Sequence, residues 1–295
     1  MVGRKPQPVK HLSKHAASAD FDDQIAAMVT ALGLPRAALS FVDFADGRCH
    51  HYRADEWFHA ASTIKVAIMV ALFALEEDGE VGMNSAIRVT NDFHSVVEDA
   101  PFRLEPERDS CPELYRWLGH EVAVDALVRD MIVSSSNLAT NLLLASTGVS
   151  VLQQKLVELG VDGVELRRGV EDEAAFQQGI INRVTARGLL QLFTHIWQGE
   201  WPGARHRQDM LEILFEQRFS DRIPSGIPED IRAHTRFAHK TGEISTVVHD
   251  AGLVFLPERM PYGLVVLTET GGSPENSRQL IRALSRLVYR QRLKP

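Results

Sequence analysis

Apolar residues recur along the chain with two spacings, one typical of helices and one typical of strands. Near the start, the stretch 25–34 predicts an amphipathic helix that ends near Gly33. Two strand-like runs follow at 37–44 and 48–52, and Ala45-Asp46-Gly47 lies between them. Because Asp-Gly accepts the positive φ of a tight turn, this segment predicts a β-hairpin.

The middle of the chain has the spacing of helices. From Val124 to Ile132, apolar residues recur at intervals of three and four, which places them on one helical face. Comparable patterns occupy 62–78, 138–145, 151–159, 187–197 and 210–215. These segments together predict a block of helices.

Strand patterns return near the end of the chain, at 236–240, 251–256 and 262–268, and an amphipathic helix follows at 277–292. The early hairpin and the late strands are each too short to be stable alone, so we expect them to form one sheet. The predicted fold class is α/β of the α+β kind: an antiparallel sheet with flanking terminal helices and an inserted all-helical lobe.

This pattern divides the chain into lobes that form one catalytic unit. We expect a disordered tail at 1–19, a discontinuous α/β lobe at 20–61 and 220–295, and a helical lobe at 62–219. A cleft between two lobes is the usual place for a small ligand, and we expect the site there.

Composition removes several classes of function. Lys and Arg number 32 against 39 Asp and Glu, a net charge of −7, and no dense basic run could follow a phosphate backbone, so no nucleic-acid partner is expected. The longest apolar run, 66–75, is well short of the roughly 20 residues of a membrane span. Acidic residues directly precede the first apolar stretch, unlike a signal peptide. As it stands the sequence predicts a cytoplasmic protein, or a periplasmic or secreted one whose signal has been removed.

Metal and cofactor chemistry has no signal in the sequence. Cys49 and Cys111 are far apart and specify neither a metal site nor a disulfide framework. No H-E-x-x-H and no G-x-S-x-G occurs among the twelve histidines and the serines. We expect no metal and no cofactor.

The first chemical signal is Ser62-Thr-Ile-Lys65, at the start of the long apolar helix. Residues three apart share a helical face, so the amine can lie beside the hydroxyl. A lysine that is buried near another cation has a lowered pKa and can take the proton of a serine. Alone, the pair could equally be a serine cap with an extended surface lysine.

Two further motifs follow in order, Ser135-Ser136-Asn137 between helical segments and Lys240-Thr241-Gly242 on a late strand. The three together resemble the S-x-x-K, S-D-N and K-T-G set of class A β-lactamases and penicillin-binding proteins. The flanking segments 131–133 and 141–144 are also similar to that family. The resemblance implies a serine hydrolase that works through an acyl-enzyme.

The resemblance also implies a role for each motif residue. Ser62 would be the nucleophile, Lys65 the base or part of its relay, and Ser135 would return a proton to the leaving nitrogen. Asn137 would bind the acyl amide of the substrate, and Lys240 and Thr241 would bind an anionic group. The N–H groups of Ser62 and Glu243 would form the oxyanion hole, and Gly242 would let the substrate lie close to the strand.

Two departures from the family pattern affect the rigidity of the site and its deacylation. Ser136 stands where the family has an Asp, so a buried carboxylate that braces the loop is missing. After Arg168, the family's water-activating Glu is replaced by Val170, and Glu171 is one position late. The acidic run at 171–173 could be a solvated turn. If instead the loop shifts by one residue, Glu171 is the deacylation base; otherwise Lys65 must serve.

A third departure is Glu243, which shares a strand face with Thr241. At about 4 Å it would repel a substrate carboxylate by roughly 4 kcal/mol at an effective dielectric near 20. Either Lys240 neutralises it, or the preferred substrate is less anionic than penicillin. Arg222 could bind substrate or form a surface salt bridge. The acidic residues of the long segment 91–115 could form a rim or a solvated loop: Glu98, Asp99, Glu105, Glu107 and Asp109.

The sequence therefore predicts an acyl-enzyme serine hydrolase for a small acyl substrate, a β-lactam, an ester or a peptide, with β-lactam hydrolysis as the first expectation. One alternative is an esterase or peptidase for less anionic substrates. Another is a penicillin-binding protein that is acylated at Ser62 without efficient turnover.

Overall fold

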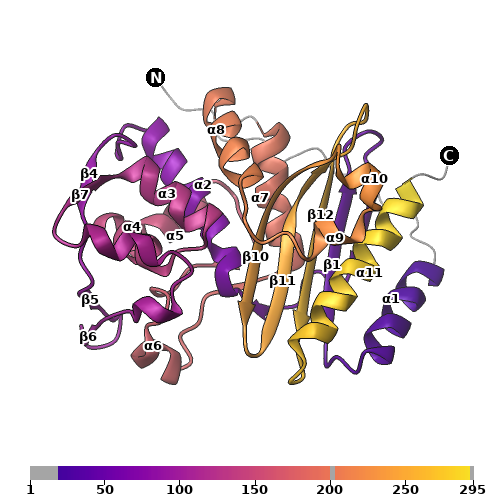
Figure 1. Cartoon of the computed structure of the whole chain (residues 1–295), viewed down its shortest axis with the longest axis horizontal. Coiled ribbons are helices and arrows are strands. Elements are labelled where there is room, and N and C mark those ends of the chain that lie inside the picture. Colours follow the sequence, from indigo (N-terminus) through magenta and orange to yellow (C-terminus); the bar gives the residue numbers. More distant parts are fainter. Residues whose placement is uncertain (1–18, 200–202, 293–295) are drawn as a thin grey trace.

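The computed structural model describes residues 19–199 and 203–292. A five-stranded antiparallel sheet lies at its centre, with the spatial order β10-β11-β12-β1-β2 (Figure 1). The strands are β1 (Ala37–Asp43), β2 (Cys49–Tyr52), β10 (Arg236–Ile244), β11 (Val247–Phe255) and β12 (Tyr262–Glu269). The sheet therefore joins the first strands of the chain to the last, as the sequence predicts.

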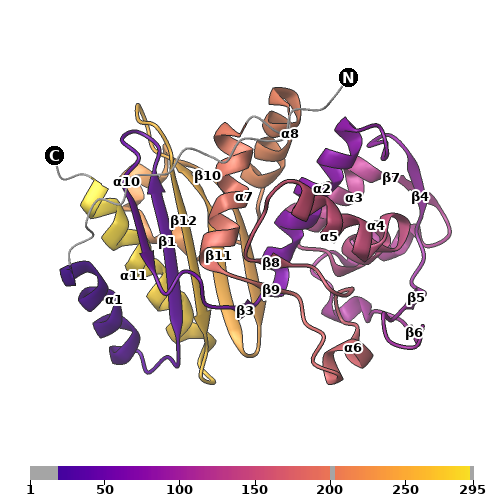
Figure 2. The ribbon, with the colours of Figure 1, turned by 180° about the vertical axis from the view of Figure 1, so that it is seen from behind.

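Helices cover both faces of this sheet (Figures 1 and 2). The terminal helices α1 (Ala19–Ala31) and α11 (Pro274–Arg292) pack on one face, where Ile25 and Leu284 share a core with Leu264 of β12. Helix α7 (Ala186–Gln198) packs on the other face, against β1, β11 and β12. The sheet is thus buried on both sides.

A helical lobe lies beside this layer and is built around α2 (Ile64–Glu77). Every residue of α2 from Ile64 to Leu75 is buried, because helices pack around it on all sides. The helices in contact with α2 are α3 (Val124–Val133), α5 (Val149–Glu158), α8 (Ala204–Phe215) and α7, while α4 (Asn137–Thr147) packs on α3 and α5. The core of this lobe is continuous with the face of the sheet that α7 covers.

Short elements connect the two parts. The 3-10 turn η1 (Ala61–Thr63) leads from β3 into α2, and β3 (Phe58–His59), β9 (Arg183–Val184) and β8 (Val164–Glu165) form a small sheet. The remaining elements are β4 (Ala86–Arg88), β5 (Phe93–His94), β6 (Pro101–Phe102), η2 (Pro106–Arg108), η3 (Pro112–Trp117), β7 (Glu121–Ala123), α6 (Glu173–Gln177), α9 (Ile223–Gly226) and α10 (Glu229–Arg232).

The predicted α+β class is confirmed, with two differences in detail. The strand predicted at 236–240 continues to Ile244, because it pairs with β11 along its whole length. Helix α7, which the predicted helical lobe contains, packs on the sheet, so the division at 62–219 stays a prediction. The predicted tail at 1–19 lies outside the described residues, except for Ala19, where α1 begins.

Two simple observations complete the fold. Among the residues described here, no helix is both long and apolar enough to cross a membrane. Cys49 and Cys111 form no disulfide with each other.

Candidate active site

Ser62 lies in η1, directly before α2 and beside the edge strand β10. The preceding residue, Ala61, has φ of +44°, a conformation that L-residues rarely adopt. Its N–H donates to Nδ1 of His59 over 3.0 Å. Burial and the charge of Arg168 lower the pKa of His59 to about 4, so the ring is neutral and can accept this bond. The turn is therefore held in a strained shape that leaves Ser62 half-buried.

Gly242 of β10 lies against this turn. A Cβ at Gly242 would lie 3.2 Å from the backbone nitrogen of Ser62 and 3.1 Å from that of Thr63, closer than ordinary contacts. A side chain at position 242 would therefore push the strand and the turn apart by a few tenths of an ångström, so glycine allows their close approach. The predicted oxyanion donors, the N–H groups of Ser62 and Glu243, belong to these two adjacent segments.

Lys65 is fully buried, one turn after Ser62. Its Nζ donates to Ser135 O over 2.7 Å and to Asn137 Oδ1 over 2.8 Å, and it lies 3.4 Å from Ser135 Oγ. Burial lowers the pKa of Lys65 to about 7, although the negative charges of Asp109 and Glu171 act in the opposite direction. A substantial fraction of Lys65 is therefore neutral near pH 7 and able to accept a proton.

Lys240 approaches Ser135 from the opposite lobe. Its Nζ donates to Ser135 Oγ over 3.0 Å and to Thr241 O over 2.9 Å. Burial, Lys65 and Arg222 lower the pKa of Lys240 well below its ordinary value. Ser135 itself has φ of +58°, which turns its hydroxyl toward both lysines. The three predicted motifs are thus joined at the hydroxyl of Ser135.

A buried carboxylate braces the second motif, although Ser136 replaces the family's Asp. Asp109, which the sequence grouped with the acidic rim, is 7% exposed. Its Oδ2 accepts from Leu138 N–H over 2.7 Å and from Ser136 Oγ over 3.3 Å, and its Oδ1 accepts from Cys111 N–H over 2.9 Å. The rim interpretation is wrong for Asp109, which caps the start of α4. The other four acidic residues, Glu98, Asp99, Glu105 and Glu107, are exposed.

Glu171 contacts the second motif directly. Its φ is +58°, and its Oε1 accepts from Asn137 Nδ2 over 2.6 Å. The amide of Asn137 therefore connects Glu171 to Lys65. Asn141 holds the loop in place by donating to Val170 O and accepting from Val170 N–H, each over 2.9 Å.

The rest of the acidic run is structural or exposed. Asp172 is buried and caps α6, because its Oδ1 accepts from Ala175 N–H over 3.1 Å. Glu173 is exposed. The solvated-turn interpretation therefore holds for Glu173 and is wrong for Glu171 and Asp172. No pattern in the sequence indicated the contact between Glu171 and Asn137, since 34 residues separate them.

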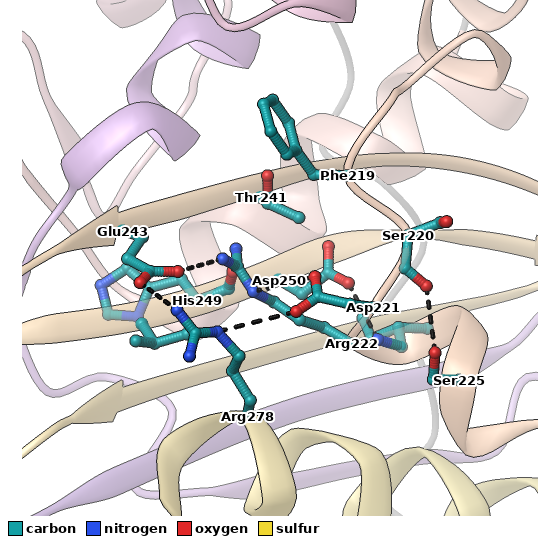
Figure 3. A network of polar contacts seen from close by, with 12 residues as sticks. Phe219, Ser220, Asp221, Arg222, Ser225, Thr241, Glu243, His249, Asp250 and Arg278 are labelled. Carbon is teal, nitrogen blue, oxygen red and sulfur yellow. Dashed lines mark hydrogen bonds and ion pairs between the residues drawn. The ribbon is translucent and has the colours of Figure 1, made fainter. Parts of the chain in front are cut away.

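Glu243 is neutralised, but not by Lys240 (Figure 3). One carboxylate oxygen accepts from Arg222 Nη2 and the other from Arg278 Nη2. Arg222 does form salt bridges, with Asp221 and Glu243, but its own side chain is buried and not on the surface. Sequence reasoning missed Arg278, which had no signal beyond its place on the polar face of an amphipathic helix.

The site defines a class of protein, a serine hydrolase: Ser62 lies one turn before the buried Lys65, and Lys65 and Lys240 both contact the hydroxyl of Ser135. The chain belongs to the beta-lactamase enzyme family, whose sequence profile matches residues 20–291. A β-lactamase from Streptomyces fradiae is 28% identical over 232 residues, which are 77% of this chain and 71% of the relative.

Solved structures agree with this assignment. PBP-A is 27% identical, with a TM-score of 0.78 over 93% of this chain and 96% of its own. A PBP-A mutant solved as an acyl-enzyme complex with penicillin G superposes with a TM-score of 0.77. A variant class A β-lactamase of the last common ancestor of Gram-negative bacteria, 24% identical over 93% of this chain and 99% of its own, shares the fold with a TM-score of 0.79.

Proposed function

We propose that this chain hydrolyses β-lactams through an acyl-enzyme on Ser62. The observation that carries the proposal is the convergence of Lys65 and Lys240 on Ser135 Oγ, next to the turn that bears Ser62. In the acylation step, neutral Lys65 takes the proton of Ser62 as its Oγ attacks the lactam carbonyl. The N–H groups of Ser62 and Glu243 then stabilise the oxyanion.

Cleavage of the lactam bond needs a proton on the departing nitrogen. We assign its delivery to the hydroxyl of Ser135, and the distances of 3.0 Å from its Oγ to Lys240 Nζ and 3.4 Å to Lys65 Nζ support this role. The proton that Lys65 takes from Ser62 can return along this path. Asn137 and Thr241 would bind the acyl amide and an anionic group of the substrate.

Deacylation needs a base within about 3 Å of the attacking water, directly or through one water. We assign this role to Glu171, because its carboxylate reaches Asn137 of the second motif. Val170, at the family's usual position, has no group that could act. This contact favours turnover over a permanently acylated protein.

Two other outcomes are supported by particular observations. Val170 and the resemblance to PBP-A favour a penicillin-binding protein with slow deacylation. The acidic side chain of Glu243 favours an esterase or peptidase for less anionic substrates. A burst of nitrocefin cleavage without steady turnover would identify the first, and faster hydrolysis of p-nitrophenyl esters than of nitrocefin would identify the second.

The decisive test is the Ser62→Ala variant. We expect it to lose nitrocefin turnover and to show no mass increase after incubation with benzylpenicillin, whereas the native chain forms an adduct visible by intact mass. Ser150→Ala, which alters an exposed serine, is the matched control and should behave as the native chain. Full turnover in Ser62→Ala, or an adduct on another residue, would refute the proposal.

A further inference from the structure

The carboxylate of Glu243 lies between two guanidinium groups (Figure 3). Oε2 accepts from Arg222 Nη2, and Oε1 accepts from Arg278 Nη2. Each oxygen thus has its own charged donor, an arrangement that proteins commonly use to bind carboxylates. The pair of arginines has the form of an anion-binding site, and a side chain of the protein occupies it.

Other groups hold both arginines in place. Arg222 is 6% exposed in its side chain, and its Nη1 donates to His249 O over 3.1 Å. Arg278 Nη1 donates to Glu275 over 3.2 Å, and its Nε lies 3.6 Å from Asp221. The guanidinium groups therefore do not depend on Glu243 alone for their position. The Glu243 side chain is 32% exposed, so solvent and solutes can reach its carboxylate.

This site borders the position of the acyl group. Glu243 directly follows Gly242, which lies against the backbone of Ser62 and Thr63. A substrate bound to Ser62 along β10 would therefore present its next group near Glu243.

We propose that Arg222 and Arg278 form a carboxylate-binding site that Glu243 occupies internally, so that the enzyme prefers acyl substrates without a carboxylate beside the scissile bond. This proposal deepens the proposed function and rests on it. An anionic substrate must either displace Glu243 from both arginines or bind without them, because Glu243 already occupies their Nη2 donors. A neutral substrate meets neither penalty.

The test compares benzylpenicillin with its methyl ester, which differ only in this carboxylate. In Glu243→Gln, which keeps the backbone N–H, the ratio of kcat/KM for the acid to that for the ester should rise by about tenfold to a hundredfold. Glu229→Gln removes an exposed carboxylate of α10 and should leave the ratio within about twofold of the native value. Glu243→Ala should repeat the result of Glu243→Gln if the glutamine variant folds poorly.

Binding of phenylacetate, followed by calorimetry, tests the anion site without any turnover. Glu243→Gln should bind it at least about tenfold more tightly than the native chain, and Arg222→Ala in the same background should abolish the gain. An unchanged substrate ratio together with unchanged phenylacetate binding would overturn this proposal. Absence of any adduct on Ser62 with either substrate would instead overturn the proposed function, and the phenylacetate result would still decide the anion site.

Discussion

At the scale of single residues, the site contains three non-glycine residues with positive φ: Ala61, Ser135 and Glu171. Such conformations cost on the order of 1–3 kcal/mol each, and they persist only where surrounding contacts enforce them. Here the His59 ring contacts Ala61, the two lysines contact Ser135, and Asn137 contacts Glu171. Each strained residue lies next to, or is itself, a group proposed for acylation or deacylation.

The first prediction concerns Glu171. Because glutamine cannot take a proton from water, Glu171→Gln should let the acyl-enzyme accumulate while Ser62 is acylated near its native rate. Intact mass after benzylpenicillin should show a persistent adduct, and steady turnover should fall by about a hundredfold or more. Glu173→Gln, at an exposed neighbour, is the control. Unchanged turnover would leave Lys65 as the base for both steps, and loss of acylation would instead indicate that Glu171 positions the loop.

At the scale of elements, the loops of the candidate site are held in place by buried polar side chains that belong to other segments of the chain. Asp109 caps α4, and Asn182 fixes the loop at Arg168 by accepting from the N–H groups of Arg167 and Arg168 over 2.7 and 3.0 Å. Asn141 holds Val170 in the same way. These contacts connect separate segments of the chain next to Ser135 and Glu171.

Asp109 also influences the base, which gives the second prediction. Acylation requires neutral Lys65, so its rate should rise with pH through about 7 and level off above it. The negative charge of Asp109 raises the pKa of Lys65, so Asp109→Asn should move this rise to lower pH. It should also cost about 1–3 kcal/mol of stability through the weakened cap.

The measurement is the acylation rate between pH 5 and 9, with thermal melting alongside. Glu107→Gln changes an exposed carboxylate of the same segment and should move neither quantity. A purely structural role for Asp109 would lower the melting temperature without moving the pH profile, and that result would contradict the electrostatic part of the prediction.

At the scale of the whole molecule, a buried ion pair joins the last helix to the first strand. Arg292 at the end of α11 donates to Asp43 of β1 through Nε over 2.6 Å and through Nη2 over 3.0 Å. Their side chains are only 2% and 3% exposed. Because α11 covers the face of the sheet opposite α7, this pair ties the end of that covering helix to β1.

The third prediction follows from that burial. Arg292→Leu leaves Asp43 as a buried charge without its main partner, so the free energy of unfolding should fall by about 3–5 kcal/mol. Urea unfolding followed by circular dichroism measures this change. Arg290→Leu, at an exposed position of the same helix, should cost far less. Equal losses in the two variants would show that the ion pair adds nothing beyond ordinary helix packing.

Local patterns in the sequence were sufficient to predict most helices and strands and to recognise the three motifs. The Asp-Gly hairpin, the amphipathic α11 and the spacing of Ser62 and Lys65 depend on neighbours within a turn or a strand. Periodicity reports such neighbours directly. The order of the three motifs then indicated one site, because the fold that they imply brings them together.

Tertiary structure alone decided which charges meet. Asp109 lies in a segment whose composition is typical of a solvated loop. It is nevertheless buried and accepts a hydrogen bond from Ser136, 27 residues away. Glu243 pairs with Arg278, 35 residues away on another element, and not with the nearby Lys240. Burial and pairing of a charge depend on which distant segments pack against one another, and a periodic pattern carries no information about that. The sequence therefore indicated Ser62 and the two lysines as one candidate site, while packing decided which side chains brace them and which charges pair with Glu243.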